Sequence, residues 1–442
     1  MRQYVVLTSC RSAGILCRCS EHCFYYRNTG VRTSAPCPEG GVCREMPVER
    51  DRPRSEEMLM LNASRKQSWI MNVAIGIGLA LLLAACGGGV STHTGPQPLN
   101  AAATKGLTAA EALVNSAEKV PPYVGPRQPI DAARLKGKTV WILVNCECNA
   151  FNASIASAAT EALHKVGIHT KILDGQGQVT NWTRQYQEAI AQHVSGIINS
   201  GDPPLLLKGP EAAAAAAHIP TVHAISDPVF PLVPGETSAV DIHFGLSGAI
   251  QAAYTIAKSR GRAHVLILGD QEFRDEIQRV KSQLAYFKHN CPDCVVTVRN
   301  VLLASLPTQV PKLVQSVLHA DPKITWILPA YDYLGTFVVQ GLKEGGFKGI
   351  NVVGADGVAQ QLDWTRSGGS YYVADVGETP VWCGWAAADE IMRAMLGVPA
   401  PPEVIPVRLF VKRNLVGVSD NPSALFRTNF QTPLEKLWGL LP

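Results

Sequence analysis

Residues 325–356 read TWILPAYDYLGTFVVQGLKEGGFKGINVVGAD, and this stretch decides the fold class. The apolar runs 325–328 and 351–353 predict buried strands, and the spacing of apolar residues over 334–344 predicts a helix between them. Two buried strands joined by a helix form a βαβ unit, in which the strands are parallel and the crossover is right-handed. We therefore expect a parallel sheet here, with Asp332 and Asp356 just beyond the ends of its strands.

The same alternation extends outward over most of the chain. Strands are expected at 139–144, 169–173, 196–199, 221–225, 264–268, 295–298 and 371–376, and helices at 154–166, 182–193, 211–218, 245–259, 272–288, 311–319 and 381–396. About 350 residues follow Cys86, and this length is large for one hydrophobic core and suits two. The predicted fold class is therefore α/β, with two doubly wound parallel-sheet lobes.

Polar and aromatic side chains gather directly after the predicted strands. They are residues 145–152, Asp174, Asn199, Asp202, Ser226, Asp227, 270–274, Tyr331, Asp332, Asp356 and Glu378. Ligands of open parallel sheets bind outside the carboxyl ends of the strands. These residues are therefore the candidates for a ligand site.

A short segment ahead of the two lobes has the features of a bacterial lipobox. Residues 83–86 read Leu-Ala-Ala-Cys and precede three glycines, 73–83 are apolar, and Arg65 and Lys66 supply positive charge. The pattern predicts a lipoprotein signal peptide over 58–86, with Cys86 as the lipidated residue. A core helix with the same ending is the alternative, but core helices rarely end in three glycines.

The residues before this signal do not resemble a folded domain. Residues 1–57 hold six of the twelve cysteines and no sustained helical or strand period, so we interpret them as a misannotated or disordered extension. A zinc or iron–sulfur module is the alternative, although the cysteine spacing matches no paired four-ligand pattern. We expect residues 87–137 to be a tether and a lead-in helix, with 87–107 flexible because Gly, Ser, Thr, Ala and Pro dominate there.

Composition and motifs exclude several classes of function. A formal net charge of +4 is too small to indicate a nucleic-acid partner. The chain has no nucleophile elbow, no glycine-rich phosphate loop and no His-Glu-x-x-His spacing. We therefore expect no enzymatic activity, no cofactor and no metal.

Several segments resemble one known family in their order and spacing. They are 327–332, 341–345, 352–357 and 378–380, followed by Gly384 and Gly397. Over about 138–411 the chain resembles ribose-type (type I) periplasmic substrate-binding proteins of ABC importers, and the predicted lipobox agrees with export. A LacI-like regulator shares the fold but needs an N-terminal helix-turn-helix and no export signal.

The resemblance implies two lobes joined by three hinge crossings. The crossings are expected near 239–241, 377–380 and 406–408. The first lobe would comprise 138–240 and 379–406, and the second 241–378 and 407–442.

The resemblance also implies ligand-binding roles for particular residues. Asp356 matches an aspartate that accepts hydrogen bonds from ligand hydroxyls, although a helix cap is the alternative. Asn149 and Phe151 match a loop that supplies an amide and aromatic rings, and Asn152 replaces a second aromatic residue. Phe151 could instead belong to the core.

Other positions match the family less closely. Asn199 and Glu378 fall on two binding positions, and Asn199 could instead be a turn residue. Tyr331 replaces a common asparagine, and its neighbour Asp332 follows the same strand. The family's Asp-Arg pair has only Asp227 as a displaced counterpart. Arg274 could supply the missing cation or could be solvated.

Cysteines after residue 86 fit an oxidising compartment. Cys291 and Cys294 have the spacing of a local disulfide. The resemblance places Cys146, Cys148 and Cys383 in or near the first lobe. We expect one disulfide among them, either from the Cys146 loop to Cys383 or within Cys146-Glu-Cys148. One thiol remains in either case.

These observations predict a solute-binding lipoprotein. It would capture a small ligand, with a sugar as the favoured class, between its lobes and deliver it to an ABC permease. The alternative is a solute sensor that reports to a membrane receptor such as a histidine kinase. The chain would act as a monomer in the bacterial cell envelope, held to the membrane by its lipid and facing the periplasm or the exterior.

Overall fold

The computed structural model describes residues 18–20, 22–24, 99–417 and 426–442. The chain divides into two compact units, residues 1–93 and 94–442. In the first unit, β1 (Arg18–Ser20) and β2 (His22–Phe24) pair antiparallel. The expected signal peptide over 58–86 and its Cys86 lie outside the described residues.

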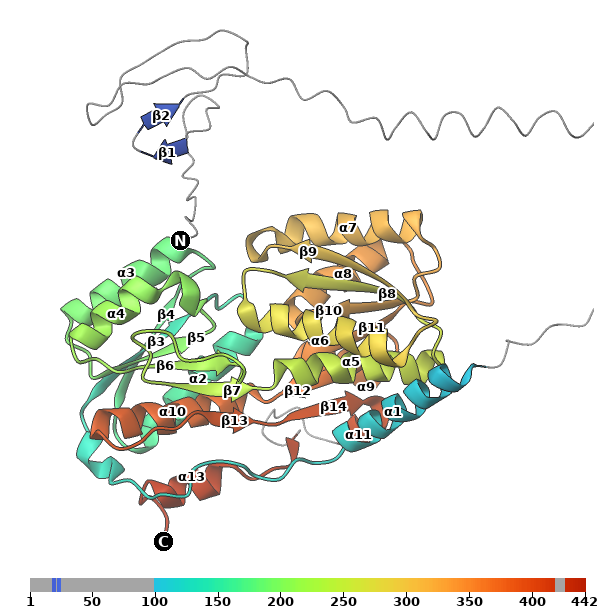
Figure 1. Cartoon of the computed structure of the whole chain (residues 1–442). Coiled ribbons are helices and arrows are strands. Elements are labelled where there is room, and N and C mark those ends of the chain that lie inside the picture. Colours follow the sequence, from blue (N-terminus) through green and yellow to red (C-terminus); the bar gives the residue numbers. More distant parts are fainter. Residues whose placement is uncertain (1–17, 21, 25–98, 418–425) are drawn as a thin grey trace, which may run out of the picture. The chain divides into compact units, whose positions relative to one another are not determined.

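The second unit contains two six-stranded sheets, one in each lobe (Figure 1). The sheet of the first lobe has the order β13-β7-β6-β5-β3-β4, and all of its strands are parallel. Its strands are β3 (Thr139–Val144), β4 (His169–Asp174), β5 (Gly196–Ser200), β6 (Thr221–Ser226), β7 (Ser238–Ile242) and β13 (Glu403–Ile405).

The sheet of the second lobe has the order β14-β12-β11-β10-β8-β9. Only the edge strand β14 runs antiparallel to its neighbour. The strands are β8 (His264–Asp270), β9 (Val295–Val301), β10 (Trp326–Pro329), β11 (Asn351–Asp356), β12 (Tyr372–Glu378) and β14 (Val407–Val411). The prediction of two α/β lobes with mainly parallel sheets is therefore confirmed.

Helices cover both sheets (Figure 1). The first lobe has η1 (Ala132–Leu135), α2 (Ala150–Lys165), α3 (Val179–Ala191), η2 (Pro204–Leu206), α4 (Lys208–Ala216), α10 (Pro380–Leu396) and α13 (Gln431–Leu437). The second has α1 (Ala101–Ala117), α5 (Phe244–Ser259), α6 (Arg274–Asn290), η3 (Leu303–Ser305), α7 (Leu306–Ala320), α8 (Asp332–Glu344), α9 (Ala359–Ser367) and α11 (Lys412–Leu415).

Helices α2 and α10 pack closely in the core of the first lobe. A glycine makes this approach possible: a Cβ atom on Gly384 would lie 2.4 Å from the carbonyl oxygen of Ile155 and 2.7 Å from the Cβ of Ala158. Both helices bury alanines along this contact. Small side chains therefore place α2, and with it the loop that precedes α2, at a fixed height above the sheet.

Three short segments join the lobes. Thr379 links β12 to α10, and Pro406 links β13 to β14. The first crossing lies at His243, between β7 and α5, and not at residues 239–241 as expected. Those residues pair with β6 and β13 inside the first sheet, because their alternate side chains are needed in its core.

The first helix of the second unit, α1, begins inside the segment that was expected to be a flexible tether. Asn100 caps α1, and its side-chain oxygen accepts a hydrogen bond from the backbone N–H of Ala103 at 2.9 Å. Alanine-rich sequence follows, and alanine has the highest helix propensity. Residues 101–107, expected to be flexible, are therefore helical, and Ala110 and Val114 pack α1 into the core of the second lobe.

The C-terminal segment returns to the first lobe, which corrects the assignment of 407–442 to the second. Phe426 still packs in the second lobe, but Phe430 and Trp438 are buried in the core of the first. The reason is aromatic packing: Phe430 stacks on Trp382 with ring centroids 5.1 Å apart, and Trp438 stacks on Trp385 at 5.4 Å.

The lead-in after α1 and the segment that carries α13 therefore add two further crossings between the lobes. After α1, the lead-in runs to Ile130 and η1, which are part of the core of the first lobe. The two end segments are joined by hydrogen bonds, from Thr428 Oγ1 to the Pro121 carbonyl at 2.6 Å and from Ile130 N–H to the Leu437 carbonyl at 2.8 Å.

Two disulfides lie among the described residues. Cys146 pairs with Cys148, and Cys291 pairs with Cys294. Cys383 is a buried free thiol in α10, so no bridge links the Cys146 loop to it. Every helix among the described residues is too short or too polar to cross a bilayer.

Candidate functional site

A pocket lies between the two lobes at the carboxyl ends of their strands. Counting the open space at its mouth, the pocket has a volume of about 660 Å³. Six of the ten ligand-binding residues expected from sequence line it: Asn149, Phe151, Asn152, Arg274, Tyr331 and Asp356. The other four lie elsewhere: Asn199, Asp227, Asp332 and Glu378.

The loop between β3 and α2 forms one wall of the pocket. Asn149 caps α2, because its side-chain oxygen accepts a hydrogen bond from the Phe151 N–H at 3.0 Å. Phe151 is nearly fully buried and is also part of the core of the first lobe, so the two alternatives for this residue do not exclude each other. Asn152 is held by its backbone carbonyl, which accepts from Ser200 Oγ at 3.1 Å.

Asn199 supports this wall from behind. Its side-chain oxygen accepts a hydrogen bond from the backbone N–H of Asp202 at 2.8 Å, and its amide nitrogen lies 3.3 Å from both the Tyr186 hydroxyl and His223 Nε2. Asn199 is fully buried. It therefore orders the turn after β5, which brings Asp202 to the pocket, and does not itself line the pocket.

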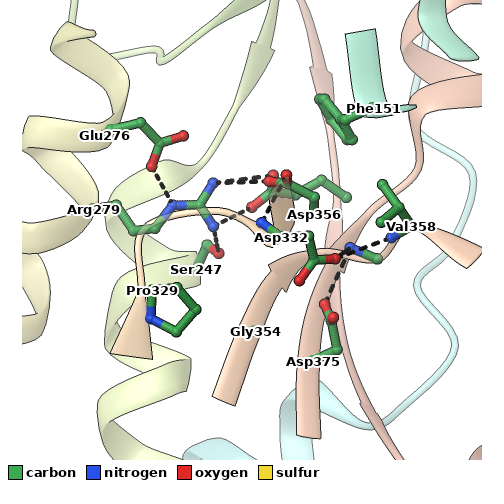
Figure 2. Close-up of polar contacts among 12 residues, drawn as sticks. Phe151, Ser247, Glu276, Arg279, Pro329, Asp332, Gly354, Asp356, Val358 and Asp375 are labelled. Carbon is green, nitrogen blue, oxygen red and sulfur yellow. Dashed lines mark hydrogen bonds and ion pairs between the residues drawn. The ribbon is translucent and has the colours of Figure 1, made fainter. Parts of the chain in front are cut away.

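A buried arginine organises the acidic floor in the second lobe (Figure 2). Arg279 Nε donates to Glu276 Oε2 at 3.0 Å, and Nη1 donates to Ser247 Oγ at 2.9 Å. Nη1 also lies 3.1 Å from Glu378 Oε1, and Nη2 lies 3.7 Å from Asp356 Oδ1. Glu378 is thus engaged by Arg279 and is kept out of the pocket.

Asp356 faces the pocket, while Asp332 holds the backbone around it (Figure 2). Asp356 Oδ2 accepts a hydrogen bond from the Asp332 N–H at 3.2 Å. Asp332 Oδ2 in turn accepts from the N–H groups of Gly357 and Val358, both at 3.2 Å. Asp332 therefore supports the turn into α9, and α9 begins without a side-chain cap, so the helix-capping alternative does not describe Asp356. Burial raises the pKa of Asp356, and the neighbouring Arg279 opposes that rise.

Arg274 extends from the second lobe to the first. Its Nη2 donates to Ser226 Oγ at 3.2 Å, and its guanidinium carbon lies 4.8 Å from the centre of the Phe230 ring. The side chain is 12% exposed, so the solvated alternative does not describe it. Arg274 therefore joins the lobes across the pocket.

Tyr331 presents its ring to the pocket and its hydroxyl to the second sheet. The hydroxyl donates to Asp270 Oδ2 at 2.8 Å. Burial raises the pKa of Asp270 to about 6, against the lowering effect of its hydrogen bonds from the Glu272 N–H and Tyr331. The phenol oxygen is thus occupied within the protein, so the aromatic face is what Tyr331 offers to a ligand.

Asp227 acts on the backbone. Its Oδ1 accepts from the Val229 N–H at 3.0 Å, and its Oδ2 accepts from the Gly245 N–H at 3.4 Å. It therefore ties the loop after β6 to the start of α5, beside the first crossing between the lobes.

The pocket also contains acidic residues that the candidate list did not include. Asp202, Asp275 and Glu276 line it, and Arg279 lies directly behind it. Asp202 was visible as a polar residue after a strand. The pairing of Glu276 with Arg279 has the i,i+3 spacing of a helical ion pair, which was the available signal for the arginine.

One buried cluster could hold a metal ion. Glu211, His223 and Glu236 place their side-chain ligand atoms within 4.8 Å of one another. His223 Nε2 lies 2.8 Å from Glu211 Oε1 and 3.3 Å from Glu236 Oε1. His223 thus lies between the two carboxylates, while Glu211 Oε2 has no hydrogen-bond partner among the described residues.

Several solved structures share this fold. An ABC sugar transporter subunit from Rhodobacter sphaeroides 2.4.1 is 19% identical, and the alignment covers 63% of this chain and 99% of that one with a TM-score of 0.56. A solute-binding protein from Burkholderia graminis C4D1M in complex with D-arabinose is 18% identical, with coverage of 64% and 98% and a TM-score of 0.58. One from Agrobacterium vitis with bound allitol is 20% identical, with coverage of 64% and 97% and a TM-score of 0.56.

The fold is thus that of type I solute-binding proteins of ABC transporters. A model of the periplasmic binding protein domain matches residues 142–397, more than half of the chain, so the chain belongs to this family. The resemblance seen in the motifs is confirmed. No curated protein matches the chain significantly. Members of the family are binding proteins for transport and not enzymes, and they are exported to the cell envelope.

Proposed function

We propose that this chain is a membrane-anchored lipoprotein that captures a small polyhydroxylated ligand, of the sugar class, and delivers it to an ABC permease. The observation that carries the proposal is the pocket shared by the two lobes, which combines aromatic rings with hydrogen-bonding side chains. Sugars need both, because their hydroxyls bind polar groups and their C–H faces pack on rings. Related solute-binding proteins in solved structures hold D-arabinose and allitol.

The proposed mechanism is a shift between open and closed lobes. A ligand that contacts Phe151 on one lobe and Asp356 on the other binds the closed state better and therefore favours closure. Asn149 and Asn152 add amide groups from the first lobe, and Arg274 adds a guanidinium from the second. Closure excludes water, which strengthens each of these hydrogen bonds.

The membrane anchor in this proposal is the lipid on Cys86. Each buried methylene of an acyl chain contributes about 0.8 kcal/mol, so two or more chains hold a protein on a bilayer stably. The residues between Cys86 and α1 would then act as the tether. The protein would face the periplasm or the exterior as a monomer, with Cys86 as its only attachment.

A thermal-shift screen of the full chain tests the binding role. Sugars, polyols, amino acids, nucleosides and small aromatic acids are the test compounds, and a ligand at one hundred times its Kd should add about 2.7 kcal/mol to the free energy of unfolding. We expect stabilisation by sugars or polyols. If no compound raises the midpoint, the proposed function is wrong.

Two substitutions then test the pocket. Phe151→Ala and Asp356→Asn each remove a contact from one lobe, and we expect either to weaken binding of the sugar found in the screen about tenfold or more. Asp363→Asn, on the partly exposed face of α9, is the matched control for the loss of a carboxylate. Unchanged affinity in the double variant would place the ligand site elsewhere.

A further inference from the structure

The wall of the pocket carries more acidic than basic groups. Four carboxylic side chains line it, and the only guanidinium or ammonium group among the lining residues is that of Arg274. The four acids are Asp202 from the first lobe and Asp275, Glu276 and Asp356 from the second. The ligand therefore enters a pocket with an excess of acceptors.

The acids of the second lobe already have cationic neighbours. Arg279 contacts Glu276 at 3.0 Å and Asp356 at 3.7 Å from behind the pocket. Arg274 Nε lies 3.9 Å from Asp275 Oδ1, at the outer limit of an ion pair. Burial raises the pKa of Asp275 to about 7, against the lowering effect of Arg274.

Asp202 is different, because no cation accompanies it. It is 1% exposed, and neither carboxylate oxygen has a hydrogen-bond donor among the described residues. The nearby histidine, His223, is already engaged, because its Nε2 lies 2.8 Å from Glu211 Oε1 and 3.3 Å from Glu236 Oε1. Burial, and then the field of Glu211, raise the pKa of Asp202. A buried carboxylate without a partner is costly, so the pocket favours a ligand that supplies positive charge and donors.

Two other buried acceptors line the same pocket without donors. Asn145 Oδ1 lies on the first lobe, where the amide nitrogen of Asn145 already donates to the Gly201 carbonyl at 2.8 Å. Asp275 Oδ1 lies on the second lobe. A protonated primary amine has three N–H donors and no acceptor, which matches this excess of acceptors better than a hydroxyl with its single donor.

We propose that the ligand is an amino sugar or amino polyol whose ammonium group binds at Asp202. The proposal rests on the proposed function and narrows it. The hydroxyls of the ligand would contact Asn149, Asn152 and Asp356, and its apolar face would pack on Phe151.

An ammonium group at this position also contributes to closure. Asp202 and Asp275 belong to opposite lobes and both face the pocket. Burial disfavours the charged form of both acids in the empty pocket, whereas a cation between them stabilises both carboxylates. An amine therefore favours the closed state more than its neutral counterpart of the same shape.

Matched ligand pairs on the full-length chain test the inference. Isothermal titration compares glucosamine, galactosamine and mannosamine with glucose, galactose and mannose, and N-acetylglucosamine serves as a bulkier neutral control. At least one amine should bind ten times or more tighter than its parent sugar. Equal or weaker binding of every amine overturns the inference but leaves the proposed function intact, provided that a neutral sugar binds.

A substitution separates the ammonium contact from other effects. Asp202→Asn keeps the shape of the side chain and should weaken the amine at least tenfold while changing the parent sugar less than threefold. Asp293→Asn removes the same charge from the exposed loop between α6 and β9 and should change neither. Equal losses for both ligands would overturn the inference.

Three further outcomes are informative. If Asp202→Asn does not fold, the comparison of amine with parent sugar on the wild-type chain still decides the inference. If Ca²⁺ or Zn²⁺ raises the melting temperature and no amine does, the unpaired carboxylate belongs to a metal site and the inference is wrong. If no sugar of either kind binds, the proposed function fails together with the inference.

Discussion

Glu390 shows how a single buried carboxyl group makes the stability of this protein depend on pH. It lies on α10 in the first lobe, is 1% exposed, and accepts a hydrogen bond from Ser238 Oγ at 2.6 Å. Burial raises the pKa of Glu390 to about 8, and the bond from Ser238 only partly offsets this rise. The group is therefore protonated in the folded chain at neutral pH.

We predict that stability falls as the pH rises from about 5 to 8. In this window the folded chain keeps the proton on Glu390 while the unfolded chain, whose glutamates titrate near 4.3, has released it. The free energy of unfolding then decreases with pH, by at most about 1.4 kcal/mol per pH unit for one group. Glu390→Gln keeps a hydrogen-bonding side chain without titrating, so its stability should fall less steeply.

Urea unfolding at pH 5, 6.5 and 8 measures this difference. Glu161→Gln, on the exposed side of α2, is the control and should follow the wild-type slope. Parallel slopes for the wild type and Glu390→Gln would mean that Glu390 does not hold a proton in the fold.

At the scale of elements, the contact between α2 and α10 is controlled by one missing side chain. Gly384→Ala adds a Cβ atom 2.4 Å from the Ile155 carbonyl oxygen, so one helix must shift. Overpacking of this kind costs about 1–3 kcal/mol, which exceeds the gain of roughly 0.5–1 kcal/mol that alanine gives to a helix. We predict a net loss of stability, measured as a lower urea midpoint.

The matched control is Gly209 in α4. A Cβ atom there would have no other atom within 4 Å, so Gly209→Ala should leave stability unchanged or raise it. An equal effect of the two substitutions would show that helix propensity, and not the spacing between α2 and α10, decides the outcome.

The elements differ in how well they could be predicted from sequence. Most of the buried parallel strands were predictable, because apolar runs such as Thr139–Val144 alternate with long helical patterns. Three strands escaped: β7, where a hinge crossing was expected, β13, which has only three residues, and the edge strand β14. The helix α13 was placed on the wrong lobe, because a short aromatic segment does not reveal which distant rings it will contact.

The site follows the same rule. Residues on the loops after strands, such as Asn149 and Asp356, could be predicted because topology brings strand ends together. For Asn199 the turn role, which was the alternative from sequence, is the one that the structure shows. The role of Glu378 could not be predicted, because its partner Arg279 comes from a distant helix. Arg279 was missed for the same reason: its effect depends on four side chains from separate elements.

At the scale of the whole unit, Arg274 is the side chain that spans both lobes. It donates to Ser226 and covers the Phe230 ring, although its own helix α6 belongs to the second lobe. We predict that Arg274→Ala favours the open arrangement in the absence of ligand. Small-angle X-ray scattering should then show a larger radius of gyration than for the wild type.

The control for this measurement is a surface arginine. Arg184→Ala removes an exposed i,i+4 pair with Glu188 on α3 and should leave the scattering curve unchanged. Identical curves for Arg274→Ala and the wild type would mean that the crossings of the chain, and not this side chain, hold the lobes together.

The return of α13 to the first lobe also determines when this lobe can finish folding during synthesis. The growing chain makes β3 about 290 residues before α13, which at 5–20 residues per second is an interval of roughly 15–60 seconds. For most of this interval the apolar face of α2 lacks α10, and Trp382 of α10 is then made before its stacking partner Phe430. The first lobe therefore cannot complete its core before α13 is made.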